Sequence, residues 1–257
     1  MAHILGVTRA WVLAHQEAVI DSQQEQALEA SMQRLENGEP LPYLLGHWEF
    51  YGLDFLVNPA VLIPRPETEL LVEQALAWLQ AHPKPVRWLA ADVGCGSGCI
   101  AVSLAVYLPD LRVLATDVSA VALELASQNA QRHGVAEQID FCQADLLPEA
   151  MELRFDLICA NLPYIPSARL SELRVARSEP HLALDGGEDG LDLIGKLLKL
   201  APSYITVDGL ILLEIEASQG QAVAGLAAAA FPEAGVSVLK DLAGLDRLVR
   251  IDLAASN

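Results

Sequence analysis

The sequence is short of basic residues, and this shortage limits the partners that the protein can bind. Its 16 lysines and arginines are outnumbered by 34 aspartates and glutamates, so the formal net charge is −18. A chain this acidic repels a phosphate backbone unless a local basic patch intervenes. The basic residues form no continuous run. We therefore expect no direct contact with nucleic acid and favour a small molecule or a protein as the substrate.

Cysteines and long apolar runs are also scarce. The four cysteines, Cys95, Cys99, Cys142 and Cys159, show no Cys-x-x-Cys spacing, which favours reduced, buried thiols in a cytosolic protein. No apolar run reaches the roughly 18 residues of a membrane span. The first residues lack the basic start and the cleavage site of a signal peptide. We predict a cytoplasmic protein without membrane contact. No metal site is expected, because no pair of its dispersed histidines has helical ligand spacing with a carboxylate.

Apolar residues, in contrast, make up 53% of the 257 residues, enough for one large α/β domain and a small accessory domain. Helical periodicity predicts helices within residues 2–36, with a cap at Asp21-Ser22. Two short extended runs, 48–51 and 54–57, predict a β-hairpin. We therefore divide the chain into a helical domain at 1–40, a hairpin linker at 41–65 and a large domain at 66–257. We expect a monomer.

Strands and helices alternate through the large domain. The pattern predicts strands at 86–93, 112–117, 139–142, 155–160 and 205–214, with helices at 66–80, 99–107, 121–133, 191–200 and 219–230. Such alternation is typical of a parallel sheet with helices on both faces, the Rossmann-like arrangement. Two final runs, 236–239 and 247–253, have no helix between them and predict an antiparallel hairpin at the sheet edge.

A glycine-rich loop, Gly94-Cys95-Gly96-Ser97-Gly98, joins the first of these strands to its helix. Glycines there let the backbone turn sharply and approach a ligand closely. The spacing is Gly-x-Gly-x-Gly, whereas the dinucleotide fingerprint is Gly-x-Gly-x-x-Gly. Asp117 ends the next strand, where a carboxylate can hold ribose hydroxyls. Asp145 and Leu146 follow the third strand and suit an adenine ring. These positions predict a site for an adenosyl cofactor, S-adenosylmethionine.

A tetrapeptide, Asn161-Leu162-Pro163-Tyr164, follows the buried fourth strand. Ligands of such sheets bind at the carboxyl ends of the strands, so this segment is expected over the cofactor. The Asn161 side-chain oxygen and the Leu162 carbonyl can accept the two hydrogens of a planar NH2 group. Pro163 restricts Leu162 to an extended conformation, and Tyr164 offers a face for stacking.

This arrangement suits methylation of an amide. An amide nitrogen is a poor nucleophile because its lone pair is delocalised. Two acceptors aim the nitrogen at the methyl group and stabilise the positive charge that develops on it. Since a sulfonium is an activated donor, orientation supplies much of the acceleration, and we predict no strong general base. We assign Asn161 and Tyr164 as catalytic, and Asn161 also as a cofactor contact.

Further segments extend the pattern: Leu62–Glu69 (Leu-Ile-Pro-Arg-Pro-Glu-Thr-Glu), Asp185–Leu191 (Asp-Gly-Gly-Glu-Asp-Gly-Leu), Glu214, and Asp241–Gly244 with Asp246-Arg247. With these segments, the chain resembles the PrmC/HemK family, the glutamine methyltransferases that modify peptide-chain release factors. The resemblance implies a class I methyltransferase domain behind a small helical domain that helps to hold the release factor. It also implies that Gly94–Gly98, Asp117 and Leu146 bind S-adenosylmethionine. Asn161, Leu162, Pro163 and Tyr164 would bind the glutamine of a Gly-Gly-Gln motif and yield N5-methylglutamine.

The chain departs from the family pattern at two places. The family usually has proline where this chain has Leu162, which keeps the carbonyl but loses some rigidity. The family's helical domain usually begins well before the segment that matches Ile4–His15, so its first helices are expected to be missing. Two other features carry hypotheses. Arg65 is expected to pair with Glu67 or Glu69, and the glycines of Asp185–Leu191 are candidates for the hinges of a lid.

Two alternatives to glutamine methylation remain at this point. The first is an exocyclic-amine methyltransferase that acts on adenine in DNA or RNA, because adenine also offers a planar NH2 group. The acidic charge argues against it. The second is a cofactor-binding module without turnover, against which Asn161 and Tyr164 argue.

Overall fold

The computed structural model describes residues 1–84, 86–149 and 153–253. Its N-terminal part consists of short helices, α1 (Ala2–Leu5), α2 (Arg9–Ala14) and α3 (Ser22–Glu36). Gly6 ends α1 in a left-handed conformation, so the predicted helical stretch before Asp21 is broken into two short helices. Asp21 then caps α3, with reciprocal bonds between Asp21 and Gln24. None of the residues in these three helices is buried.

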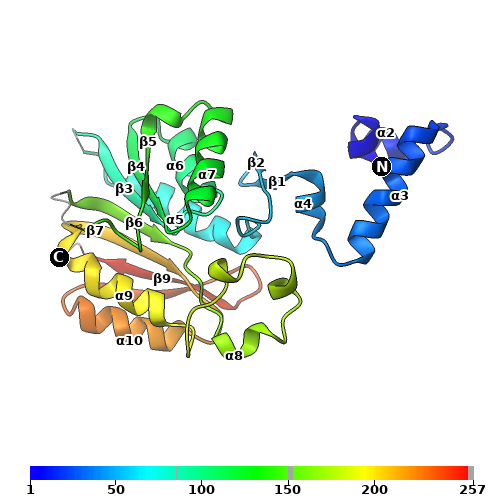
Figure 1. Ribbon diagram of the computed structural model, residues 1–257. Coiled ribbons are helices and arrows are strands. Elements are labelled where there is room, and N and C mark those ends of the chain that lie inside the picture. The colour runs from blue at the N-terminus through cyan, green and yellow to red at the C-terminus, as the bar shows by residue number, and fades with distance from the viewer. Residues whose placement is uncertain (85, 150–152, 254–257) are drawn as a thin grey trace.

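A short connection links these helices to the rest of the chain. It contains α4 (Leu41–Leu45) and an antiparallel hairpin of β1 (His47–Phe50) and β2 (Leu53–Leu56). The hairpin lies within one residue of its predicted place. Figure 1 shows α1–α3 set apart from the sheet, with α4 and the hairpin between them. No helix in the described ranges is both long enough and apolar enough to cross a membrane.

The large sheet has seven strands in the order β5-β4-β3-β6-β7-β9-β8. The parallel strands are β3 (Trp88–Val93), β4 (Leu111–Asp117), β5 (Ile139–Gln143), β6 (Phe155–Ala160) and β7 (Ile205–Glu214). The hairpin of β8 (Gly235–Lys240) and β9 (Asp246–Asp252) adds the antiparallel edge. The predicted fold class is therefore confirmed. The first strand begins at Trp88, two residues later than the pattern suggested.

Helices cover both faces of this sheet (Figure 1). On one face, η1 (Pro66–Thr68) leads into α5 (Glu69–Ala81), which packs beside α6 (Cys99–Tyr107); α6 packs in turn beside α7 (Ala120–Arg132). On the other face lie α9 (Asp192–Leu200) and α10 (Gly220–Ala230). Short helices occupy the connections: η2 (Ala136–Gln138), α8 (Ser167–Leu170), η3 (Val175–Arg177), η4 (His181–Ala183) and η5 (Ala201–Ser203). The central strands are consequently buried on both sides, as parallel strands require.

The register of the central strands sets the position of the site. Val93 in β3 pairs with Ala160 in β6, and Ala160 pairs with Leu213 in β7. The residues that follow these three paired positions are Gly94, Asn161 and Glu214. They therefore lie together at one edge of the sheet. This edge is formed by the carboxyl ends of the strands, where ligands of open α/β sheets bind.

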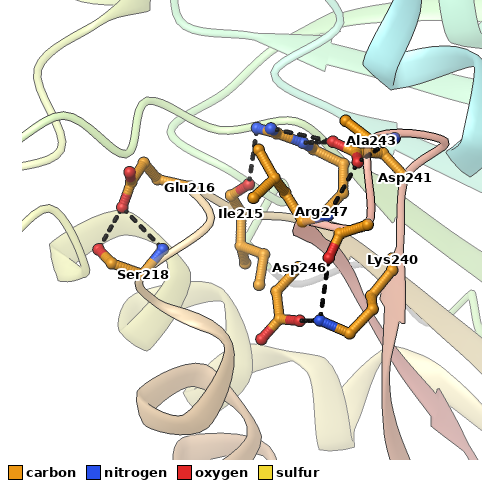
Figure 2. A network of polar contacts seen from close by, with 10 residues as sticks. Ile215, Glu216, Ser218, Lys240, Asp241, Ala243, Asp246 and Arg247 are labelled. Carbon is orange, nitrogen blue, oxygen red and sulfur yellow. Dashed lines mark hydrogen bonds and ion pairs between the residues drawn. The ribbon is translucent and has the colours of Figure 1, made fainter.

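The turn between β8 and β9 is held by a polar network at the same edge (Figure 2). Asp241 accepts hydrogen bonds from the backbone of Ala243 and Leu245 and from the guanidinium of Arg247. Arg247 also donates to the carbonyl oxygen of Ile215, directly after β7. The Asp241–Arg247 motif therefore fixes the turn and the chain that leaves β7.

Candidate active site

A cavity of about 610 Å³ lies at the carboxyl edge of the sheet, a size typical of small-molecule sites. Most of the predicted site residues line it: Gly94, Cys95, Gly96, Ser97, Asp117, Asp145, Leu146, Asn161, Leu162 and Pro163. Segments remote in the sequence complete the wall, among them Ala60–Leu62, Thr68, Pro180 and Leu182–Ala183. The glycine loop and the tetrapeptide thus share one cavity.

The glycine loop is tied to the end of β4. Gly94 and Cys95 donate backbone hydrogen bonds to the Thr116 carbonyl, and Gly96 donates to Asp117 Oδ2 at 2.9 Å. The other carboxylate oxygen of Asp117 accepts from the Ser119 backbone. Because both oxygens are held, the carboxylate has one orientation at the cavity wall. A Cβ at Gly96 would meet no atom of the described residues within 4 Å, so the loop is open there for a ligand.

Leu146 takes up a left-handed conformation, with φ of 69°, which is unusual for a residue with a branched side chain. The Thr116 hydroxyl donates to the Leu146 carbonyl at 2.5 Å, and the side chain is buried. The surrounding structure thus supports a backbone strain of about 1–3 kcal/mol. Strain of this kind often occurs where a side chain is directed at a ligand, and Leu146 lines the cavity.

Asn161 is oriented by a residue that the sequence patterns did not single out. Its Nδ2 donates to the hydroxyl of Thr68 at 3.0 Å. Thr68 is itself buried at the start of α5. The amide nitrogen of Asn161 is therefore engaged with the protein, which leaves Oδ1 as the acceptor that the predicted chemistry needs.

Two predicted site residues lie outside the cavity lining. Gly98 caps α6, and a Cβ there would stand 2.9 Å from the Cβ of Ala126, so this glycine allows α6 and α7 to pack closely. Tyr164 is half-buried beside Glu214, and desolvation raises the pKa of its phenol. The Tyr164 carbonyl accepts from Gln219. In this structure both residues support the wall of the cavity rather than form it.

The loop Asp185–Leu191, whose glycines are candidates for the hinges of a lid, packs against the tetrapeptide from behind. Asp185 accepts from the Ser167 hydroxyl at 2.6 Å and from the Gly187 backbone. A Cβ at Gly186 would stand 2.7 Å from the Pro163 carbonyl oxygen. The glycines thus permit close packing of backbone against backbone, and the loop is held in place.

The predicted pairing of Arg65 with Glu67 or Glu69 is wrong. Arg65 pairs with Glu179 at 2.5 Å, and the other Glu179 oxygen accepts from the Ile63 backbone. Glu69 instead accepts from the Tyr51 backbone. The Arg65–Glu179 pair joins the linker to the segment before Pro180, two parts of the cavity wall. The partner is far away in the sequence, so local spacing could not reveal it.

Asn129 on α7 is another positioning residue that the sequence patterns did not reveal. It is fully buried, and its Oδ1 accepts from the Leu56 backbone at 2.7 Å. Its Nδ2 donates to the carbonyls of Leu56 and Ser97. One side chain thereby joins the hairpin to the glycine loop. A buried asparagine on the apolar face of a helix was the available signal.

Burial shifts the titratable groups below the site towards their neutral forms. Burial raises the pKa of Asp92 to about 7, although its carboxylate accepts from the Ala101 backbone. Burial also raises the pKa of the Cys99 thiol to about 12 and that of the Cys95 thiol well above its ordinary value. The two cysteines therefore act as small packing residues beside the loop, as predicted.

Comparison with known proteins identifies the fold and then the family. Residues 68–213 match the methyltransferase small domain, and residues 1–46 match the PrmC N-terminal domain. A methyltransferase from Pyrococcus furiosus aligns with a TM-score of 0.58 at 16% identity, over 86% of this chain and 97% of that one. The hMettl16 catalytic domain, in complex with a MAT2A 3′UTR hairpin, aligns with a TM-score of 0.60 at 16% identity, over 80% and 77%. Fold and site together define a Rossmann-like methyltransferase.

Sequence relatives are more specific. The release factor glutamine methyltransferase of Moorella thermoacetica is 46% identical over 94% of this chain and 85% of its own length. That of Bordetella pertussis is 41% identical over 96% of this chain and 90% of its own length. The chain belongs to the family of the release factor glutamine methyltransferases.

Proposed function

We propose that this protein transfers a methyl group from S-adenosylmethionine to the side-chain amide nitrogen of the glutamine in the Gly-Gly-Gln motif of a peptide-chain release factor. The observation that carries the proposal is the orientation of Asn161, whose Nδ2 is bound to Thr68 while Oδ1 remains for the substrate. Family membership favours glutamine over the adenine alternative. It also favours a catalyst over a module that only binds the cofactor.

The cofactor would bind along the glycine loop, and the cavity fits it. Gly94–Ser97 line the cavity with open space at Gly96, Asp117 presents a fixed carboxylate for ribose hydroxyls, and Leu146 with Asp145 would contact the adenine ring. Bound there, S-adenosylmethionine supplies a methyl group activated by a sulfonium. The role of the protein is then to orient the target nitrogen and to exclude water.

The substrate amide would bind at the tetrapeptide. Asn161 Oδ1 and the Leu162 carbonyl accept hydrogen bonds from its two N–H groups. They also stabilise positive charge on nitrogen as the new bond forms. Pro163 lines the cavity and limits the freedom of Leu162. We propose a supporting role for Tyr164, because its half-buried side chain lies beside Glu214 and is not part of the cavity lining.

The release factor would bind as a folded partner across the mouth of the cavity. We propose that the helical part at 1–40 helps to hold it, that 41–65 is a linker, and that 66–257 carries the chemistry. A monomeric, cytoplasmic enzyme is part of the same proposal. The net charge of −18 supports a protein substrate over a nucleic acid.

One assay tests the function directly. The protein is incubated with radiolabelled S-adenosylmethionine and a release factor, beside a version whose Gly-Gly-Gln glutamine is replaced by alanine. We expect label on the first and none on the second. Asn161→Ala should lower the rate by about 100-fold, because one acceptor is lost in the transition state. Equal labelling of both release factors, or of neither, contradicts the proposal.

A further inference from the structure

We propose that Glu214 is a positioning residue: together with Thr68 it fixes the Asn161 amide so that Oδ1, and not Nδ2, faces the substrate nitrogen. This inference rests on the proposed function and adds a residue that acts through Asn161. It concerns a buried carboxyl group that the transfer chemistry described above does not use.

Glu214 lies in the correct place for this role. It is the last residue of β7, and the register of β6 with β7 places it beside Asn161. The alternation along β7 directs Leu210 and Leu212 towards the face that carries α5, and Leu213 towards the other face. Glu214 continues this alternation and points to the α5 side, where Thr68 begins the helix.

When Glu214 is ionised, the donors and acceptors of Glu214, Thr68 and Asn161 can be matched in only one arrangement. The β6–β7 register brings the carboxyl beside Asn161, and the Thr68 and Asn161 side chains both act to lower its pKa. A carboxylate only accepts, so it must face the Thr68 O–H and the Asn161 NH2 group. The Thr68 oxygen in turn accepts from Asn161 Nδ2. Both acceptors select the nitrogen end of the amide, and its oxygen end is therefore left for the cavity.

Burial of Glu214 disfavours the ionised form that this arrangement requires. The side chain is 2% exposed, and its Oε2 has no hydrogen-bond partner in the described part of the protein. Desolvation raises the pKa of the Glu214 carboxyl to about 7, with hydrogen bonds from Thr68 and the charge of Arg247 acting against this shift. A carboxyl group buried at such a cost is explained by a role in the site, and the orientation of Asn161 provides that role.

Paired substitutions test the inference. Thr68→Val removes the hydroxyl at nearly constant shape, and Glu214→Leu removes the acceptor. We expect each to lower kcat by about 10- to 100-fold while the Kd for S-adenosylmethionine changes less than about threefold. Thr68→Ser should retain kcat within about threefold. The double variant should be no slower than the slower single variant, because both act through Asn161.

Ser103→Ala is the matched control, because Ser103 is a fully buried hydroxyl on α6 with no hydrogen-bond partner among the described residues. It should leave kcat unchanged. Normal kcat in Thr68→Val or in Glu214→Leu, with the control also normal, overturns the inference. So does an equal loss in Ser103→Ala, which would show that any change to a buried side chain slows the enzyme.

The pH profile gives a second readout. A protonated Glu214 can donate to Asn161 Oδ1 and so permit the flipped amide. We therefore expect kcat to fall below about pH 7 in the wild type, and to depend less on pH in Glu214→Gln. The charged and titratable groups around Glu214 are Arg247 on β9, Glu67 on η1, Cys99 on α6 and Tyr164. An unaltered profile in Glu214→Gln counts against the inference.

A measurement without substrate separates this inference from the proposed function. The side-chain NH2 signals of Asn161 are assigned in a ¹⁵N spectrum by their loss in Asn161→Asp. We expect solvent exchange of these hydrogens to be at least about tenfold faster in Glu214→Leu and Thr68→Val than in the wild type. Unchanged exchange overturns the inference even if no release factor is methylated. Failure of methylation by the wild type alone refutes only the proposed function.

Discussion

The backbone of Gly186 lies against Pro163 so closely that a Cβ at Gly186 would stand 2.7 Å from the Pro163 carbonyl oxygen. The Cα of Tyr164 would be 2.8 Å away from the same Cβ. Both neighbours are backbone atoms and cannot rotate away. We therefore expect Gly186→Ala to push the tetrapeptide out of place, to lower kcat at least tenfold and to cost about 1–3 kcal/mol of stability. Turnover and urea unfolding measure the two effects.

Gly195→Ala is the control for that substitution, because Gly195 lies in α9 and a Cβ there would meet no atom of the described chain within 4 Å. Alanine is the better helix former, so this variant should be as stable as the wild type or more stable by up to about 1 kcal/mol. Normal turnover in Gly186→Ala would show that the loop does not support the tetrapeptide.

The Arg65–Glu179 pair should matter more than the other ion pairs of the surface. Arg65→Ala leaves the Glu179 carboxylate, whose side chain is 4% exposed, with only the Ile63 backbone as a partner among the described residues. We expect a loss of about 1–3 kcal/mol in the free energy of unfolding and a higher KM, since two parts of the cavity wall separate. The exposed Arg34–Glu39 pair provides the comparison, and Arg34→Ala should cost about 0–1 kcal/mol. Equal losses in the two variants would contradict this ranking.

Asp117 should act on cofactor binding. Asp117→Ala removes the carboxylate that accepts from Gly96 and Ser119, so the loop loses a support and the ribose loses an acceptor. We expect the Kd for S-adenosylmethionine, measured by calorimetry, to rise at least about tenfold. Asp140→Ala, an exposed position on β5, should leave it unchanged. A normal Kd in Asp117→Ala would remove this residue from the cofactor site.

The pKa values of Asp92 and Glu214 predict a pH dependence of stability. Burial raises both to about 7, from 3.8 and 4.5. Between about pH 4 and pH 7 the two carboxyls are ionised in the unfolded chain but protonated in the folded protein. Stability is therefore lost as pH rises through this range and then levels off. Each group costs up to about 3–4 kcal/mol above pH 7. Asp92→Asn and Glu214→Gln should therefore gain stability over the wild type at pH 8, and much less at pH 5, in urea unfolding.

Leu162 tests how much the proline of the family pattern contributes. The Leu162 side chain is buried against Gly94, and its carbonyl is the group that the proposed chemistry uses. Leu162→Pro keeps this carbonyl, gains rigidity and loses apolar contact. We expect kcat to change less than about tenfold in either direction. A hundredfold rise in turnover would show that rigidity at this position limits the enzyme.

Local patterns in the sequence determined much of the fold. The strands at 155–160 and 205–214 and the helix at 99–107 form with the predicted bounds. The spacing of apolar residues specifies such elements directly, because it shows which faces of a helix or strand are buried. The glycine loop and the tetrapeptide were also evident, since each follows a buried strand and the carboxyl ends of parallel strands meet at one edge.

Only the tertiary structure decided which side chains meet. Thr68 and Asn161 are 93 residues apart, and Arg65 and Glu179 are 114 apart. Such contacts depend on the order and register of the strands and on where α5 packs, which no local spacing encodes. For the same reason Tyr164, Gly98 and the Asp185–Leu191 loop received predicted roles at the cavity, while their packing against neighbouring segments makes them its support. The sequence specified the elements and the chemistry of the acceptors, and the packing between distant segments decided how Asn161 is held.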